Sequence, residues 1–203
     1  GDGLFCTDWN SDGKEDLWIG APYAETTLLG NETDDWGIAG LFSGTTFDQL
    51  LVNHPTGEVA FPTGFTNTVV GPVDSGNNES LFASDMCKGD LIPSILGNEM
   101  IFTASLFDST HTGTTAGLVS VIDYQRVSSS SFLNPYSLVN QQENIRIEGA
   151  GGSFRFGYRA EAAEINPSLA GDELVVSSPR GNANNRDGGI VYIFNPNSMA
   201  FPR

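Results

Sequence analysis

The segment that most constrains this chain covers residues 8–16 and reads Asp-Trp-Asn-Ser-Asp-Gly-Lys-Glu-Asp. Oxygen-bearing side chains occupy its positions 1, 3, 5 and 9, which are Asp8, Asn10, Asp12 and Asp16. Ca²⁺ takes about six to eight oxygen ligands, which alternate residues of a tight loop can supply. Gly13 permits the sharp bend, and the backbone carbonyl of Lys14 adds a further oxygen. The segment therefore predicts a calcium-binding loop.

The flanking residues exclude an EF-hand, which begins with the same spacing. An EF-hand needs a bidentate glutamate at position 12 and a helix on each side of the loop. Position 12 is Ile19, and both flanks are short, apolar and β-prone, the second ending at Gly20 and Pro22. We expect the loop to join two strands. The alternative to calcium is a metal-free turn held by its own Asp and Asn side chains.

The composition favours a folded, all-β protein. Of the 203 residues 39% are hydrophobic, and 13 Phe are available for a core. The 24 Gly and 10 Pro indicate many short strands separated by turns. No long helical period is present, since the nearest candidate, residues 159–164, is too short to define a helix.

The charge limits the classes of partner. The formal net charge is −16. Binding to nucleic acid depends on Lys and Arg against phosphate, so this class of function is excluded, and anionic lipid surfaces are disfavoured. No apolar run approaches the roughly 20 residues of a membrane span.

Several features indicate a secreted or cell-surface location. The chain starts at Gly1 with neither an initiator Met nor a signal-peptide pattern, so we expect a piece of a longer or processed protein. Glycosylation sequons occur at Asn31 and Asn78, and a calcium loop suits the extracellular space. Cys6 and Cys87 form either one disulfide or two separate thiols, and the sequence leaves both readings open.

The chain contains an internal repeat. Residues 4–10 align with residues 81–87 and, more weakly, with residues 162–166. After a loop, each copy continues into a second strand at residues 16–22, 99–105 and 173–179. A third strand opens with Gly40, Gly117 and Gly189, at steps of 77 and 72 residues.

A repeat of this length, holding three or four short strands, suits one blade of a β-propeller. Residues 144–148 supply a remaining strand of a blade. A β-sandwich is the alternative, but the matched order of motifs in three copies favours the propeller. We therefore expect an incomplete propeller of four-stranded antiparallel blades, with repeats at approximately 1–60, 61–140 and 141–203.

Two short motifs resemble the FG-GAP repeat family. Phe156-Gly157 precedes an acidic loop and then Ser177-Ser178-Pro179, and Gly20-Ala21-Pro22 directly follows the calcium loop. The arrangement is similar to the propellers of integrin α-subunits and of glycosylphosphatidylinositol-specific phospholipase D. The resemblance covers nearly the whole chain. It is weakest in the second repeat, where Leu81-Phe82-Ala83 and Thr103-Ala104-Ser105 replace the motifs.

The resemblance implies calcium ligands only in the first loop, at Asp8, Asn10, Asp12, the Lys14 carbonyl and Asp16. The second loop keeps Asp85 and Glu99, and the third keeps Glu164, Asn166 and Glu173. Apolar residues and proline fill the rest of both loops, so we expect packing and hydrogen bonds to hold them without metal. The alternative for the third loop is weak metal binding through Glu164, Asn166 and Glu173.

No catalytic constellation is visible in the sequence. His54 and His111 lack a second ligand at metal spacing, and the pairs Asp34/Asp35 and Asp172/Glu173 lie in or beside turns. Residues 182–188 indicate either a hairpin loop or a contact loop on the face of a propeller. The three tryptophans, Trp9, Trp18 and Trp36, are expected to pack in the core.

Two functions follow from this interpretation. In the first, the chain is an extracellular calcium-binding propeller module for adhesion, recognition or scaffolding, which binds a protein or glycan through its loops. In the second, it is the propeller of a secreted phospholipase D-like hydrolase whose catalytic domain lies outside the chain. Propellers have about four to eight blades, so remaining blades or a partner chain must complete this one.

Overall fold

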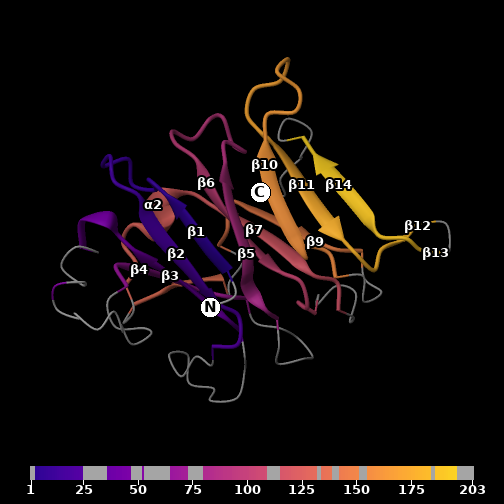
Figure 1. Ribbon diagram of the computed structural model, residues 1–203, viewed down its shortest axis with the longest axis horizontal. Coiled ribbons are helices and arrows are strands. Elements are labelled where there is room, and N and C mark those ends of the chain that lie inside the picture. Colours follow the sequence, from indigo (N-terminus) through magenta and orange to yellow (C-terminus); the bar gives the residue numbers. More distant parts are fainter. Residues whose placement is uncertain are drawn as a thin grey trace.

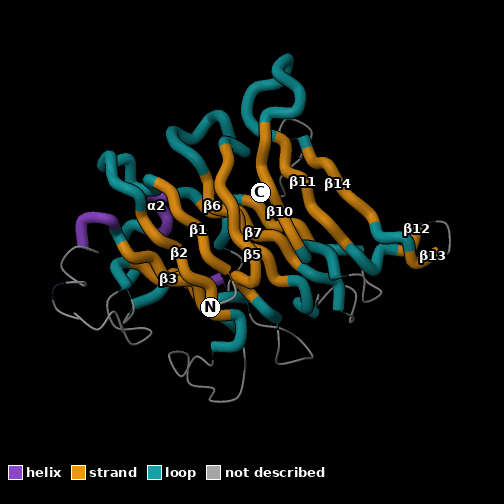
Figure 2. Tube along the Cα trace, in the orientation of Figure 1, coloured by secondary structure: helices purple, strands orange, loops and turns teal. Residues whose placement is uncertain are grey.

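The short apolar runs between turn residues form β-strands, and the chain is mostly β (Figures 1 and 2). The computed structural model describes residues 3–24, 36–46, 52, 65–72, 80–108, 115–131, 134–138, 142–150, 155–183 and 186–195. The short helix α2 (Tyr124–Val127) is capped by the Asp123 carboxylate, which accepts a hydrogen bond from the Arg126 amide. The all-β class predicted from composition is confirmed.

Within the described residues, the strands form three larger sheets and one small hairpin. The first sheet has the order β1-β2-β3-β4-β8, from β1 (Gly3–Thr7), β2 (Asp16–Ala21), β3 (Ile38–Phe42), β4 (Asn67–Val70) and β8 (Tyr136–Ser137). The second has the order β5-β6-β7-β9, from β5 (Phe82–Gly89), β6 (Glu99–Ala104), β7 (Leu118–Ile122) and β9 (Ile145–Glu148). The third has the order β10-β11-β14, from β10 (Arg159–Ala163), β11 (Glu173–Ser178) and β14 (Ile190–Phe194).

Neighbouring strands are antiparallel, except that β8 pairs parallel to β4. The hairpin expected at residues 182–188 is present as β12 (Asn182–Ala183) and β13 (Arg186–Asp187). The weak helix candidate at residues 159–164 is not helical: its first five residues, Arg159–Ala163, form strand β10. The three sheets lie side by side, and the described residues form no closed ring (Figure 1).

The pairing registers define how the three repeated units correspond, where a unit consists of a first hairpin and the third strand that pairs with it. The last pair of each first hairpin is Thr7 with Asp16, Gly89 with Glu99, and Ala163 with Glu173. Asp8 therefore corresponds to Asp90 and Glu164. The alignment of residues 4–10 with residues 81–87 is wrong, because a bulge between Phe82 and Met86 adds residues to β5 and places Asp85 inside the strand.

The glycine that opens the third strand is also shifted in the first unit. Gly37, Gly117 and Gly189 directly precede β3, β7 and β14, and their φ angles are 78°, 81° and 72°. This left-handed conformation is readily accessible only to glycine. Gly40, predicted for this role, lies inside β3, where the Phe65 ring fills the space of a side chain.

A buried phenylalanine joins each sheet to the one before it. Phe82 is fully buried and Phe156 is 4% exposed. Each is flanked by two residues of positive φ, namely Leu81 and Ala83 in one case and Arg155 and Gly157 in the other. This shared backbone supports the correspondence of Leu81-Phe82-Ala83 with the Phe156-Gly157 motif, although the motif residues themselves differ.

Each phenylalanine sits against a pair of glycines of the preceding sheet. A Cβ on Gly71 would lie 2.7 Å from the Phe82 Cβ, and one on Gly149 would lie 2.8 Å from the Phe156 Cβ. Gly71 N donates to Gly37 O at 3.0 Å, and Gly149 N donates to Gly117 O at 2.9 Å. The same glycine pair thus closes strands three and four in the first two sheets and leaves room for the next sheet.

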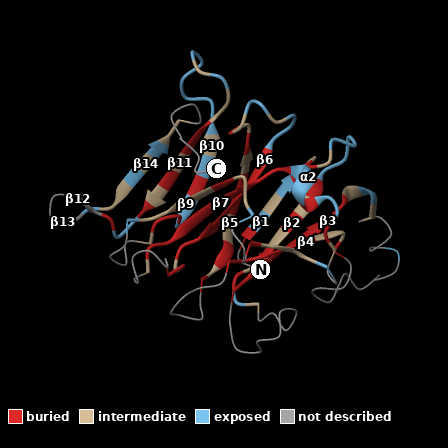
Figure 3. Ribbon diagram, turned by 180° about the vertical axis from the view of Figure 1, so that it is seen from behind, coloured by how far each residue is buried: buried red, intermediate tan, exposed pale blue. Residues whose placement is uncertain are grey.

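Most of the core lies between the sheets in two layers, and a smaller cluster of Trp36, Ile38 and Val70 packs separately. One layer joins the first and second sheets through residues such as Trp18, Leu41, Phe102 and Leu118. The other joins the second and third sheets through residues such as Ile101, Val119, Leu174 and Val176. Successive residues of β7 therefore face opposite layers, and all five are buried (Figure 3).

The sheets divide the chain differently from the predicted repeats. β4, counted with the second repeat, pairs with β3 in the first sheet, and β9, counted with the third, pairs with β7 in the second. The sequence repeat therefore starts inside a sheet, and each sheet ends with a strand from the following stretch of chain.

Truncating the phenylalanine that joins two sheets tests this arrangement. We expect Phe156→Ala to lower the free energy of unfolding by about 3–5 kcal/mol, because it removes a buried ring and leaves a cavity. Urea denaturation followed by tryptophan fluorescence measures the change. Leu96→Ala, at a leucine that is 99% exposed, is the control and should shift stability by about 0.5 kcal/mol or less. A loss below about 1 kcal/mol for Phe156→Ala would contradict a stabilising role for the Phe156 ring in the core between the second and third sheets.

Candidate functional site

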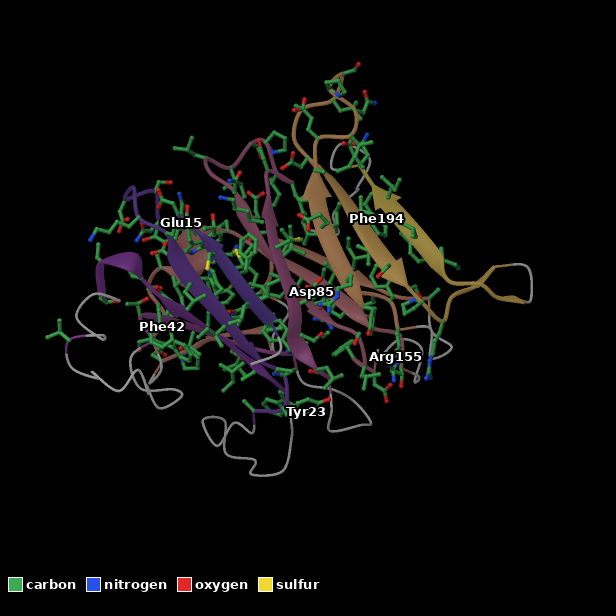
Figure 4. The ribbon with its side chains drawn as sticks, in the orientation of Figure 1. Glu15, Tyr23, Phe42, Asp85, Arg155 and Phe194 are labelled. Carbon is green, nitrogen blue, oxygen red and sulfur yellow. The ribbon has the colours of Figure 1, made fainter. Side chains whose placement is uncertain are left out.

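The candidate metal loop connects β1 and β2 and lies at one edge of the molecule (Figure 4, near Glu15). Asp16, the first residue of β2, is 1% exposed. Its Oδ2 accepts hydrogen bonds from Trp9 N at 3.0 Å and Asn10 N at 3.3 Å, and its Oδ1 accepts one from Gly44 N at 2.8 Å. Asp16 therefore ties the start of the loop to the end of β3.

The same carboxylate contact recurs in the other two loops. Glu99 Oε2 accepts from Leu91 N at 2.8 Å and Ile92 N at 3.2 Å. Glu173 Oε2 accepts from Ile165 N at 2.9 Å and Asn166 N at 3.1 Å. We call Asp16, Glu99 and Glu173 the clamp residues. Because the second and third loops lack the calcium pattern, clamping the loop does not depend on a metal.

The clamp changes how the predicted ligand Asp16 is interpreted. In the first unit the clamp residue is separated by seven and six residues from its two donors, and in the others by eight and seven. The shorter side chain, that of Asp16, therefore occurs in the shorter loop, and the two glutamates occur in the longer ones. The structural role of Asp16 is therefore to hold the loop. An ionised carboxylate has about four lone-pair sites, so the three hydrogen bonds that Asp16 accepts leave a site for a metal ion.

The other predicted ligands converge around the first turn. Asp8 Oδ1 and Asn10 Oδ1 both accept from Asp12 N, at 3.0 and 2.9 Å. Asn10 Nδ2 donates to Asp12 Oδ2 at 3.0 Å, and Asp8 Oδ2 accepts from Gly13 N at 2.9 Å. Asp12 Oδ1 accepts from Lys14 N at 2.9 Å. These bonds are the Asx-type turn contacts of the metal-free alternative.

The donor set nevertheless fits a calcium ion in its chemistry. Asp8, Asn10 and Asp12 present oxygen atoms within one turn, the loop is open to solvent from residue 11 to residue 15, and no heavy atom would crowd a side chain at Gly13. Among the described residues, no group of three or more His, Cys, Asp or Glu side chains is arranged to hold a metal. The converging set has only two carboxylates, with Asn10 as the third member, while Asp16 turns toward the backbone. Calcium binding at Asp8, Asn10, Asp12, Lys14 and Asp16 remains a prediction.

Aromatic side chains cover the inner side of the loop. The Trp9 ring is 6% exposed and makes edge-on contacts with Trp18 and Tyr124, at centroid distances of 5.9 and 5.8 Å. Trp18 in turn contacts Phe102 of the second sheet at 5.4 Å. The expectation that Trp9, Trp18 and Trp36 pack in the core is confirmed, since all three are buried.

A small pocket of about 180 Å³ lies beside the first loop. Its lining includes Leu17 and Phe42, which alternate with core residues of β2 and β3 and so face away from the second sheet. Asp16 and the free thiol of Cys6 also line it. Cys87 is a buried free cysteine, so the structure has two separate thiols. Burial raises the pKa of the Cys87 thiol, which suits an inert core position.

The second and third loops contact each other. Asp172 Oδ2 accepts from Asp90 N at 2.9 Å, and Asp172 N donates to Asp90 O at 2.7 Å. Burial and the nearby Asp172 charge raise the pKa of Asp90. Asp85, predicted as a loop residue, instead lies between β5 and β10, where it accepts from Arg159 Nη1 and Ala160 N, both at 2.9 Å (Figure 4).

The second clamp residue titrates near neutral pH. Glu99 is fully buried, and its Oε1 has no hydrogen-bond partner. Burial, which outweighs the hydrogen bonds from Leu91 N and Ile92 N, raises the pKa of Glu99 to about 7. The Oε1 atom of Glu173 is likewise buried without a partner. The two glutamate clamps therefore each contain a desolvated carboxylate oxygen, whereas both oxygens of Asp16 are bonded.

Several predicted features lie outside the described residues. These are the sequons at Asn31 and Asn78, the histidines His54 and His111, and the acidic pair Asp34 and Asp35. None of the helices in the described ranges has the length and apolar character that crossing a membrane requires. A comparison with models of known protein families found no match, and a comparison with curated proteins found none either.

Replacing Glu99 by glutamine tests the buried carboxyl. Its pKa is about 7 in the folded chain against an ordinary value of 4.5, so from pH 4.5 to 7 the folded state retains a proton that the unfolded state has lost. The free energy of unfolding should therefore fall by about 2–3 kcal/mol as the pH rises through this window. We expect Glu99→Gln, which cannot ionise, to remove this contribution in urea titrations at a series of pH values.

The control for this experiment is Glu15→Gln at an exposed glutamate of the first loop, which should leave the pH dependence in place. An unchanged slope between pH 4.5 and 7 in Glu99→Gln would show that another group titrates there.

Proposed function

We propose that this chain is part of an extracellular, calcium-binding β-propeller of the FG-GAP type that serves adhesion, recognition or scaffolding and is not itself catalytic. The observation that carries the proposal is the threefold recurrence of one unit. Each unit joins a first strand, a clamped loop and a second strand, and then a third strand opened by a glycine of positive φ.

The contacts between units support a radial arrangement of blades. The second sheet packs on the first, and the third packs on the second, through the same phenylalanine and glycine pair. A repeated interface of this kind places successive sheets in equivalent orientations, which is the requirement for a propeller. The second sheet, with the order β5-β6-β7-β9, provides the pattern for a four-stranded blade.

The proposed calcium ion has a structural role in the first loop. Asp8 and Asp12 are linked through the same turn, so their charges repel each other. An ion held by Asp8, Asn10, Asp12 and the Lys14 carbonyl, with Asp16 behind them, would neutralise this repulsion and make the loop rigid. The second and third loops are held by the clamp and by their mutual contact, and need no ion.

The loops provide a surface for a ligand. The three clamped loops emerge at the same edge of the molecule (Figure 1). A protein or glycan ligand bound through these loops fits the way in which rigid β-scaffolds present binding residues. Further blades or a partner chain complete the propeller in this proposal, and glycans at Asn31 and Asn78 accompany the extracellular location.

Calcium titration tests the proposal. Sites in extracellular modules have dissociation constants of roughly 0.1–1 mM, so 10 mM Ca²⁺ should raise the free energy of unfolding by about 1.4–2.7 kcal/mol. We expect Asp12→Asn to weaken binding at least about tenfold, because it removes a charged ligand and keeps an oxygen for Lys14 N. Isothermal titration calorimetry and thermal unfolding in calcium or chelator measure both effects.

Glu15→Gln is the matched control for Asp12→Asn. It removes the same charge from the same loop, at a position outside the alternating ligand pattern, and should change the affinity by less than about twofold. Equal effects of the two substitutions would indicate diffuse attraction of the ion. A folded chain with no response to calcium would refute the calcium part of the proposal.

A further inference from the structure

The second and third loops, which follow β5 and β10 at the same edge of the molecule (Figure 1), are joined by a contact that we call the latch. It consists of two hydrogen bonds, from Asp90 N to Asp172 Oδ2 at 2.9 Å and from Asp172 N to Asp90 O at 2.7 Å. The two chains are closely packed there, because a Cβ on Gly171 would lie 2.5 Å from Asp90 O and 2.7 Å from Pro93 Cγ. The third loop therefore lies directly against the base of the second.

Two carboxyl oxygens of the second loop are buried at this contact without a partner. Asp90 Oδ1 and Glu99 Oε1 accept no hydrogen bond within the described part of the chain. The other oxygen of Glu99 holds the amides of the two residues that follow Asp90, so the two acids belong to the same turn. A buried carboxylate oxygen without a donor or a counter-charge disfavours the ionised form of its group.

Three acids act on one another across the latch. Burial and then the charge of Asp172 raise the pKa of Asp90. Burial raises the pKa of Glu99 to about 7 despite two amide hydrogen bonds, and the charge of Asp90 adds to the rise. Asp172, Asp90 and Glu99 therefore form one group of acids that spans both loops, and its members favour protonation of each other.

The equivalent place between the first and second sheets carries a positive charge that the latch lacks. Lys88 Nζ donates there to Thr7 Oγ1, directly before the first loop. The registers make Ala162 equivalent to Lys88, and Gly89 equivalent to Thr7. A Cβ on Gly89 would lie 2.2 Å from Ala162 Cβ, so these two residues meet as Lys88 and Thr7 do. A small apolar contact thus replaces the lysine beside the latch.

The other charged residues of the adjoining elements do not supply a counter-charge. Asp85 of β5 and Arg159 of β10 pair with each other at 2.9 Å. Glu161 of β10 and Glu164 of the third loop are exposed, and Glu173 accepts from the amides of its own loop. Among the described residues, no Lys or Arg contributes to the pKa of either acid of the second loop.

We propose that the latch is a proton-dependent switch, which holds the second and third loops together while its acids carry protons and releases them when the acids ionise. Separation of the loops admits water to Asp90 Oδ1 and Glu99 Oε1, and water stabilises the ionised forms. The inference goes beyond the proposed function, because it depends neither on calcium nor on further blades. Where the loops present a binding surface, ionisation changes the relative position of two of them.

The pH range of the switch follows from the state of Glu99. Its pKa is about 7 in the closed latch and returns toward the ordinary value of 4.5 when the loops separate. Between these values the closed latch retains a proton that the open loops have lost. The closed state is therefore favoured below this range and weakens as the pH rises through it. The raised pKa of Asp90 acts in the same direction, above its ordinary value of 3.8.

Hydrogen exchange of the two latch amides, Asp90 N–H and Asp172 N–H, tests the proposal on the full 203-residue chain. Each exchange rate is compared with its intrinsic rate at the same pH to give a protection factor. We expect both protection factors to fall at least about tenfold between about pH 5.5 and about pH 8. The latch amides should exchange faster than those of β7 throughout, because the loops separate locally while the sheets stay folded.

A matched pair of variants assigns the response to the buried acid. Glu99→Gln cannot ionise and keeps an oxygen for the two clamped amides, so the fall in protection at Asp172 should shrink to less than about threefold. Glu161→Gln makes the same change of charge at an exposed position of β10 and should leave the tenfold fall in place. Asp172→Asn, which keeps an acceptor for Asp90 N, should raise the protection of that amide at about pH 8.

The Asp172 amide distinguishes a latch from a clamp that acts alone, because it belongs to the third loop and Glu99 does not hold it. A pH response confined to the Leu91 and Ile92 amides would place the titration inside the second loop and refute the latch. Exchange of the latch amides at the rate of β7, or equal effects of Glu99→Gln and Glu161→Gln, would also refute it. All measurements are made in chelator, so a failure of the calcium site leaves the outcome unaffected.

Discussion

The packing of Phe82 and Phe156 against glycine pairs is the interaction on which the arrangement of the sheets depends. The backbone and Cβ of each phenylalanine lie against the preceding sheet where strands three and four end, and the two glycines there have no side chain that would hold the backbones apart. The glycines are also hydrogen-bonded to each other, so the surface on which the phenylalanine backbone lies belongs to the strand ladder itself. The spacing between sheets and the ends of the strands are therefore fixed together. This coupling explains why Ala83, with a φ of 60°, retains a backbone conformation that costs energy outside glycine.

The sequence predicted what depends on local chemistry. Alternating side chains and turn residues predict the loop at residues 8–16 and a strand on each side of it. The structure has both strands, at the places where an EF-hand would have helices. The buried tryptophans and the hairpin near residue 187 follow in the same way. The role of Asp16 was not predictable from its own loop, because a carboxylate in a ligand pattern looks like a ligand. The signal that identifies it is the acid that begins the second strand in all three units, at Asp16, Glu99 and Glu173.

The errors in the repeat alignment have a physical origin. Residues 81–87 resemble residues 4–10 in sequence, but Phe82 is the ring that joins two sheets, and the bulge after it displaces Asp85 from the loop. Asp85 then finds a different partner, the Arg159 guanidinium of the third sheet. Bulges do not change composition or alternation enough to be visible in one sequence. The prediction of Gly40 in place of Gly37 is wrong for a related reason. A glycine that starts a strand and a glycine that lets a ring pack look alike in a sequence, and only the φ angle distinguishes them.

One unit thus supports different chemistry at its two ends. At the packed end both interfaces between sheets use the same contacts, because the distance between sheets tolerates little variation. At the loop end only the buried acid is shared, and each loop is free to differ once that acid holds its first two amides. The first loop uses this freedom to gather exposed oxygen ligands, and the second and third use it to contact each other through Asp90 and Asp172. Because the clamp carries the stability of the loop, a ligand pattern can be gained or lost there without refolding the sheet. A metal loop beside two loops without one is therefore compatible with a single repeated fold.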